Sequence, residues 1–277
     1  MPDMPPPNDL SAKAGWADIQ AAMRRDGDTF SADIPENWRQ GRTAYGGLTA
    51  ALMLAGVMKR FEDLPPLRSA LINFVGPVTG SPTLYSNLQR QGRNVTSLSS
   101  EAKVGEKSVG RAEFLFGAAR SSNITVDFPA PAAPPPKEVP LFTPPAMRDV
   151  VPGFFHNFDT RLIAGGHPMM GADEGYIRTW SRHKHAASRA GIESLLCIGD
   201  VLPPAAMPLM KTFAPISSMS WIFNVLMDAP ATENGWWHIE SKLTAARGGY
   251  SSQVMRIWNT DGQLVVEGLQ SIAIFDG

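Results

Sequence analysis

The chain has 277 residues, of which 43% are hydrophobic and 18% are charged, and its net charge is -1. This composition supports a large buried core, in one large domain or two small ones, and excludes a chain that is disordered throughout. The balance of charges argues against nucleic acid or an anionic membrane as the main partner. Because Cys197 is the only cysteine, no intrachain disulfide is possible.

The N-terminal segment carries no targeting signal that we can identify. Residues 1–15 are rich in proline and polar residues, and they lack the basic and apolar regions of a signal peptide. The apolar run 46–58 stops at Lys59-Arg60, short of the roughly 20 residues that a membrane helix needs. We therefore expect a loose N-terminal arm on a soluble, cytoplasmic protein without a membrane span.

A proline-rich stretch, PAPAAPPPKEVPLFTPPAM at 129–147, divides the chain into halves of similar length. Proline lacks a backbone donor and fixes an extended backbone, so this stretch predicts a linker or a strap over the surface. Each half shows the same order: a strand, a helix and four strands. The predicted strands are 28–38, 67–78, 83–93, 95–105 and 107–117, then 154–164, 217–228, 235–249, 251–262 and 263–277; the predicted helices are 45–61 and 191–207.

Two features refine this pattern. Asp261-Gly262 lies between two apolar alternations and predicts a hairpin, while Pro203-Pro204 disturbs the second helix. One helix followed by a meander suggests a sheet wrapped around a helix. Two such units packed side by side would protect the sheet edge and the apolar helix surface that one unit leaves exposed.

Several common catalytic motifs are absent. The sequence has no dinucleotide-binding glycine motif after a strand and no G-x-S-x-G elbow. His183 and His185 are the only residues with a spacing that suggests a metal, and their charged neighbours favour a solvated face. Cys197 lies among apolar residues and favours an inert core thiol. We expect no metal and no cofactor.

Three polar positions interrupt apolar segments of the second half. Asp200 follows LLCIG, and an isolated carboxylate there is either a helix cap or a functional group, because burying a bare charge is costly. Ser218 and Ser220 share one strand face with Ile222 and Asn224 if the strand is regular. Gln270 interrupts the strand GLQSIAIF, where an outward-facing position is the simpler alternative.

Together these segments resemble the acyl-CoA thioesterase II (TesB-like) family of double-hotdog thioesterases. The resemblance rests on AYGGLTAALML, the R-x-G-R turn at 90–93, IGDVLPPA, SSMSWIFNVLMD and DGQLVVEGLQSIAIF, in that order. It implies an α+β double hotdog, with two antiparallel sheets each wrapped around a central helix. It also implies an N-terminal hotdog at 1–128, the linker at 129–147, and a C-terminal hotdog at 148–277 that carries the active site.

The resemblance also implies roles for single residues. Asp200, Ser218 and Gln270 match the three positions that bind and activate the hydrolytic water, although Ser217 also fits the hydroxyl position. Trp221 lies beside this site as a substrate-binding candidate. Gly46 and Gly47 open the first helix and are either part of an oxyanion wall, since glycine permits close backbone approach, or simple packing residues.

An alignment of the two halves by eye supports a single site. Asp200 corresponds to Gly47, Ser218 to about Leu67, and Gln270 to about Phe114, so all three polar groups are missing from the first half. We expect hydrolysis of acyl-CoA thioesters by a homodimer. Two alternatives stay open: a hotdog enoyl-thioester hydratase, whose D-x-N-P type motif is absent here, and a non-catalytic acyl-CoA- or lipid-binding protein.

Overall fold

The computed structural model describes residues 13–275, so most of the predicted N-terminal arm lies outside the described residues. The helices are α1 (Trp16–Ala21), α2 (Gly46–Arg60) and α3 (Ile192–Gly199). The strands of the first half are β1 (Arg24–Asp26), β2 (Thr29–Ser31), β3 (Arg39–Gln40), β4 (Thr43–Ala44), β5 (Leu67–Phe74), β6 (Thr83–Gln91), β7 (Val95–Val104) and β8 (Lys107–Gly117). Those of the second half are β9 (Phe158–Gly165), β10 (Tyr176–His183), β11 (Ile216–Val225), β12 (Trp237–Arg247), β13 (Tyr250–Trp258) and β14 (Leu264–Ile274).

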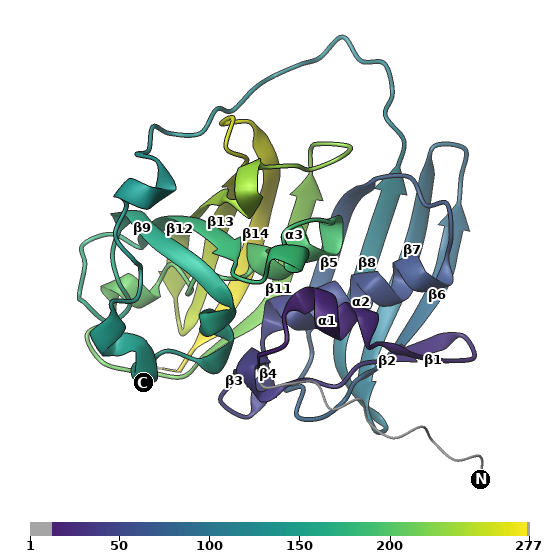
Figure 1. Ribbon diagram of the computed structural model, residues 1–277, viewed down its shortest axis with the longest axis horizontal. Coiled ribbons are helices and arrows are strands. Elements are labelled where there is room, and N and C mark those ends of the chain that lie inside the picture. Colours follow the sequence, from purple (N-terminus) through teal and green to yellow (C-terminus); the bar gives the residue numbers. More distant parts are fainter. Residues whose placement is uncertain (1–12, 276–277) are drawn as a thin grey trace.

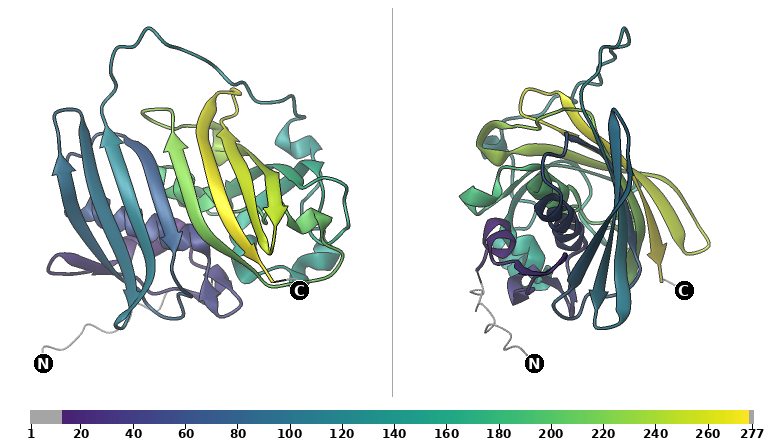
Figure 2. Two further views of the ribbon diagram at one scale, coloured as in Figure 1. Left: turned by 180° about the vertical axis from the view of Figure 1, so that it is seen from behind. Right: turned by 90° about the vertical axis from the view of Figure 1, so that its right-hand side faces the viewer.

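Twelve of these strands form one antiparallel sheet, seen from behind in Figure 2, with the order β1-β2-β6-β7-β8-β5-β11-β14-β13-β12-β10-β9. The two halves join where β5 pairs with β11, and Trp221 lies opposite Ile72 in this pair. The expectation of two separate sheets is therefore wrong. Each half would leave one long edge strand unpaired, and joining these two edges satisfies the backbone groups of both.

Helix α2 lies across the inner face of the N-terminal strands, in contact with β6, β7 and β8 (Figure 1). Alanine and leucine dominate its sequence, and residues 47–57 are all buried. Lys59 and Arg60 occupy its last turn, where positive charge complements the helix dipole. The helix predicted at 45–61 is confirmed.

Helix α3 is much shorter than the helix predicted at 191–207. It ends at Gly199, and a short 3-10 turn, Met207–Leu209, follows the break. Pro203 disfavours helical geometry in the residue before it and Pro204 cannot donate inside a helix, so the chain leaves the helix at Asp200. Only the first half therefore has a long central helix.

The eight long strands predicted after the two helices are confirmed as β5–β8 and β11–β14, including the hairpin at Gly262, which has φ +77. The strand predicted at 28–38 is wrong beyond Thr29–Ser31, because the chain turns into the 3-10 helix Glu36–Trp38. The prediction missed β10 altogether. His183, at its end, is buried and its Nε2 lies 3.1 Å from the carbonyl oxygen of Ser194, so the predicted solvated face is wrong for this residue.

Residues 118–135, which have no helix or strand and include the start of the proline-rich stretch, arch between the two halves (Figure 1). Two indole groups hold this segment: the Trp258 N–H donates to the Phe128 carbonyl at 2.8 Å, and the Trp180 N–H donates to the Pro134 carbonyl at 2.9 Å. The domain limits at 128 and 148 stay predictions. Within residues 13–275, no helix combines the length and the hydropathy needed to cross a bilayer.

Candidate active site

The side chains of Asp200, Ser218 and Gln270 meet at one point. The amide nitrogen of Gln270 lies 2.9 Å from Oδ1 of Asp200 and 3.1 Å from Oγ of Ser218. The three residues come from the end of α3, from β11 and from β14. Gln270 is only 2% exposed, so the alternative of an outward-facing glutamine is wrong. The structure thus brings together the three residues that the sequence singled out.

A β-bulge decides which serine joins this group. The register between β11 and β14 shifts between Ser218 and Ser220, so Ser218 lies opposite Ile272 while Trp221 lies opposite Gln270. Ser218 therefore shares the inner face with Gln270, and the predicted common face of Ser218 and Ser220 is wrong. Ser217 is exposed, and its Oγ lies 3.5 Å from the carbonyl oxygen of Ser218 rather than against Gln270.

The carboxyl group of Asp200 has an unusual environment. Burial raises its pKa to about 7, although hydrogen bonds from Gln270 and from the backbone N–H of Gly47 favour the charged form and partly oppose this shift. Gly47 lies in the first turn of α2, where the helix dipole also favours negative charge. A carboxyl group that titrates near neutral pH is suited to accept a proton during catalysis.

The two glycines that open α2 allow this close approach. A Cβ atom on Gly46 would lie 2.7 Å from Oδ2 of Asp200, and one on Gly47 would collide with the carbonyl oxygen of Cys197. Tyr45 fixes the same contact, since its hydroxyl donates to the Cys197 carbonyl at 2.8 Å. Gly47 therefore packs tightly against α3, and its N–H group is already bonded to Asp200.

Trp221 is packed in the core next to the residue that precedes Asp200. Its side chain is 1% exposed and lies edge-on to Phe223, with ring centroids 5.1 Å apart. Both rings occupy the space where a Cβ atom on Gly199 would lie, immediately before Asp200, at 2.8 Å for Phe223 and 3.1 Å for Trp221. A direct contact between Trp221 and substrate, which the sequence suggested, would need this ring to become accessible.

Gln253, which was not predicted from the sequence, belongs to the same polar group. Gln253 lies opposite Gln270 in the β13–β14 pair, is fully buried, and donates its amide N–H to Oε1 of Gln270 at 2.7 Å. Its own Oε1 accepts the backbone N–H of Ala205 at 2.6 Å. The available signal was its position in SSQVMRIW, where it shares the inward alternation with Met255 and Ile257.

The corresponding place in the first half is apolar. The register between β5 and β8 shifts between Leu67 and Ser69, the counterpart of the bulge in β11. Counting from this shift, Leu67 occupies the position of Ser218, and Phe114 occupies that of Gln270. Both are buried in the core. The alignment by eye placed these two residues correctly.

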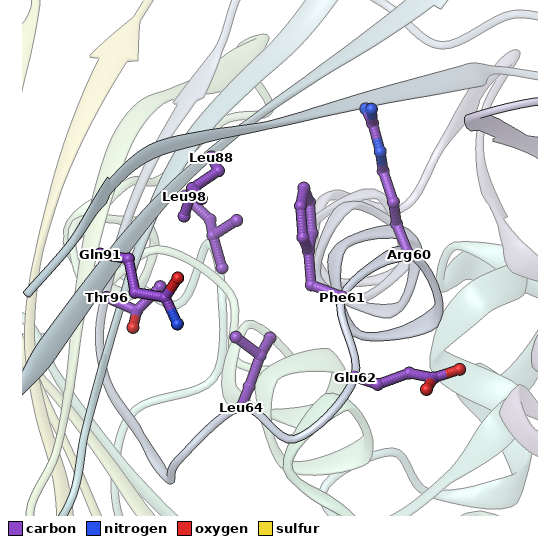
Figure 3. A pocket seen from close by; sticks show the side chains of 8 residues that line it. All are labelled: Arg60, Phe61, Glu62, Leu64, Leu88, Gln91, Thr96 and Leu98. Atoms are coloured by element: carbon purple, nitrogen blue, oxygen red, sulfur yellow. The ribbon is translucent and has the colours of Figure 1, made fainter.

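A separate pocket lies at the other end of α2, with a volume of about 350 Å³. Figure 3 shows Phe61, Leu64 and Leu98 gathered at its centre, while Arg60 points away from them. Arg60 is engaged with Asp28, 2.6 Å away. The pocket shares no residue with the Asp200 group; its lining consists of Arg60, Phe61, Glu62, Leu64, Leu88, Gln91, Thr96 and Leu98.

The described residues hold no cluster of three or more His, Cys, Asp or Glu side chains that could bind a metal ion. Cys197 is buried, and burial raises the pKa of its thiol well above the ordinary value. Such a thiol stays protonated and unreactive at neutral pH. The Cys197 thiol therefore offers no nucleophile beside Asp200.

Comparison with solved structures places the chain in the hotdog fold. A protein of unknown function with a hot dog fold from Alicyclobacillus acidocaldarius superimposes with a TM-score of 0.84 at 22% identity, covering 95% of this chain and 98% of that one. Acyl-CoA thioesterase II TesB2 from Mycobacterium marinum gives 0.70 at 16% identity, covering 91% and 95%. The dehydratase domain of PpsC from Mycobacterium tuberculosis gives 0.51 at 13%, covering 91% and 97%.

Sequence families give a more specific result. Comparison with curated protein sequences gives no match. The acyl-CoA thioesterase N-terminal domain matches residues 34–117, and the acyl-CoA thioesterase C-terminal domain matches residues 128–274. The second match alone spans more than half of the chain. This protein therefore belongs to the acyl-CoA thioesterase family.

Proposed function

We propose that this thioesterase hydrolyses acyl-CoA to a free acid and CoA through one water molecule activated by Asp200 and oriented by Ser218 and Gln270. The observation that carries the proposal is the contact of the Gln270 amide with both Asp200 and Ser218. A thioester carbonyl lacks the resonance that protects an amide, so a well-placed water can attack it without a covalent intermediate.

The hydrogen bonds leave the right groups free for this water. Gln270 donates to Oδ1 of Asp200 and to Oγ of Ser218, so Oδ2 of Asp200 can accept a proton and the Ser218 hydroxyl can donate its own. The water oxygen attacks the carbonyl carbon as Asp200 takes its proton. The C–S bond then breaks, and the departing CoA thiolate takes the proton from Asp200.

The oxyanion that forms during this attack needs donors. The first turn of α2 has N–H groups without partners inside the helix, and its dipole favours negative charge. Because the Gly47 N–H is bonded to Asp200, we assign the N–H of Gly46 to the oxyanion. A donor of this kind is commonly worth about 2.7–4 kcal/mol in the transition state. The reactive side chains thus come from the C-terminal half, and the N-terminal half supplies the start of α2.

A hotdog hydratase is the rival reading, because a dehydratase domain shares the fold. The pKa of Asp200 is set by burial and by hydrogen bonds from Gln270 and Gly47. No histidine contributes to it, which does not favour a hydratase that uses a histidine. The test is a screen of thiol release from saturated acyl-CoAs of graded chain length, with hydration of crotonyl-CoA measured in parallel and D200N as the blank. Thiol release that depends on Asp200 supports the proposal, whereas hydration without thiol release contradicts it.

We also propose that the expected homodimer forms through the outer face of the sheet. Leu71, Ile222, Leu269 and Val254 lie directly opposite one another on four neighbouring strands and form an apolar row on this face. Glu113 flanks the row beside Leu71, and Lys242 flanks it beside Val254. A two-fold axis parallel to the strands would place Glu113 of one copy opposite Lys242 of the other.

A further inference from the structure

A chain of hydrogen bonds leads from the backbone to the proposed base. The N–H of Ala205 donates to Oε1 of Gln253, and the amide of Gln253 donates to Oε1 of Gln270. The amide of Gln270 then donates to Asp200 and Ser218. Gln253 and Gln270 are 0% and 2% exposed, so bulk water does not compete for the two bonds that Gln253 makes.

The two ends of this chain fix its direction. A backbone N–H can only donate, so the group of Gln253 that faces Ala205 must be its carbonyl oxygen. The amide nitrogen of Gln253 then faces Gln270, so the group of Gln270 that accepts this hydrogen bond must be its carbonyl oxygen. The amide nitrogen of Gln270 is consequently the group that faces Asp200. At the other end, a carboxylate can only accept, which agrees with this direction.

We propose that Gln253 is a positioning residue that holds the amide of Gln270 in its productive orientation. This inference rests on the function proposed above and extends it beyond the three residues in contact with the water. With the Gln270 amide turned over, its oxygen would face Oδ1 of Asp200 at the same 2.9 Å separation, and two acceptors would repel each other. The Ser218 hydroxyl would then have to donate to Gln270 and would be lost to the water.

Two substitutions separate this role from simple packing. Q253M keeps the volume but removes the acceptor of the Ala205 N–H and leaves Gln270 free to turn over, whereas a variant that keeps this acceptor isolates the effect on Gln270. Q253E keeps the acceptor for Ala205 and, when its carboxyl group is ionised, replaces the donor to Gln270 with a second acceptor, so above the pKa of that carboxyl group it drives the Gln270 amide into the wrong orientation. We expect kcat to fall about 10-fold in Q253M and about 100-fold in Q253E, with KM changed less than about threefold. Q89M alters an exposed glutamine that bonds Ser99 on the N-terminal strands of the sheet, and it should match wild type.

The pH profile and a double variant complete the test. In Q253E, the turned amide no longer stabilises the Asp200 carboxylate, so the apparent pKa of kcat/KM should rise. In a Q270M background, Q253E should cause no further loss of kcat, because Gln253 acts only through Gln270. Wild-type kcat in both Gln253 variants would overturn the inference. So would a fall in kcat on adding Q253E to Q270M that is as large as the fall caused by Q253E in the wild-type background. Wild-type activity of D200N would instead overturn the proposed function, so the two failures are distinguishable.

Discussion

The amide nitrogen of Gln270 lies 2.9 Å from Oδ1 of Asp200, although 70 positions separate the two residues in the sequence. The bond ties the end of α3 to the middle of β14, within a polar group that also contains Ser218 and Gln253. In the first half, the position of Gln270 is taken by Phe114. One half of the molecule thus keeps a hydrogen-bonded polar group at a place where the other half has an apolar core.

The pH dependence of turnover follows from the raised pKa of Asp200, about 7. A protonated carboxyl group cannot accept the proton of water, so activity must appear as the group ionises. We expect kcat/KM to rise with pH, to reach half of its maximum near pH 7, and to be level above about pH 8.5. The measurement is initial-rate thiol release between about pH 5 and pH 9. A rate that is flat or falls over this range would show that Asp200 is not the base.

Ser217 and Ser218 form a matched pair of neighbours. Ser218 accepts the Gln270 amide at 3.1 Å, whereas Ser217 is exposed and outside the group. S218A should lower kcat about 10-fold or more, since it removes a hydrogen bond that orients the water, and S217A should behave like wild type. Steady-state kinetics of both variants decide the point; the reverse pattern would move the hydroxyl role to Ser217.

Gly46 leaves room for the Asp200 carboxylate. In G46A the new Cβ atom would lie 2.7 Å from Oδ2 of Asp200 and 3.2 Å from the ring of Phe74, so the carboxylate must move. We expect a fall in kcat of about 10- to 100-fold. G76A is the control, because its nearest neighbour, the Ser108 carbonyl oxygen, is 3.9 Å away. Equal activity of the two variants would mean that the position of Asp200 is not critical.

The proposed dimer face predicts that one positive charge placed on it will separate the two subunits. L269K places a lysine in the middle of the apolar row and should convert the dimer to a monomer at micromolar concentration. L88K is the matched control, since Leu88 is 46% exposed and Leu269 is 44% exposed, but Leu88 lies outside the row. Light scattering coupled to size-exclusion chromatography measures the mass. A wild-type monomer, or a dimer that survives L269K, would contradict the proposed face.

Much of the fold could be predicted because strand alternation and turn residues are local signals. The helix at 45–61 and the meanders of both halves needed only these patterns. The joined sheet could not be predicted, because the sequences of β5 and β11 contain no local signal that these two edge strands pair with each other. The early end of α3 has a local cause in Pro203-Pro204, because proline disfavours helical geometry in the residue before it.

The three site residues were predicted through the resemblance to the thioesterase family, and two of them also stood out as polar residues in apolar segments. These two are Asp200 and Gln270. Ser218 was assigned by the resemblance alone, and the bulge in β11 that separates its face from that of Ser220 could not be predicted from regular alternation. Gln253 was missed because its importance lies in its register opposite Gln270, and strand register is a property of the pair rather than of either sequence.

The most direct test of the account compares the kcat of wild type and D200N for thiol release from one saturated acyl-CoA, with thermal unfolding as a check that both proteins are folded. Loss of the base should lower kcat by about 10²–10⁴-fold while KM changes little. A folded D200N protein whose kcat stays within about threefold of wild type would contradict water activation by Asp200.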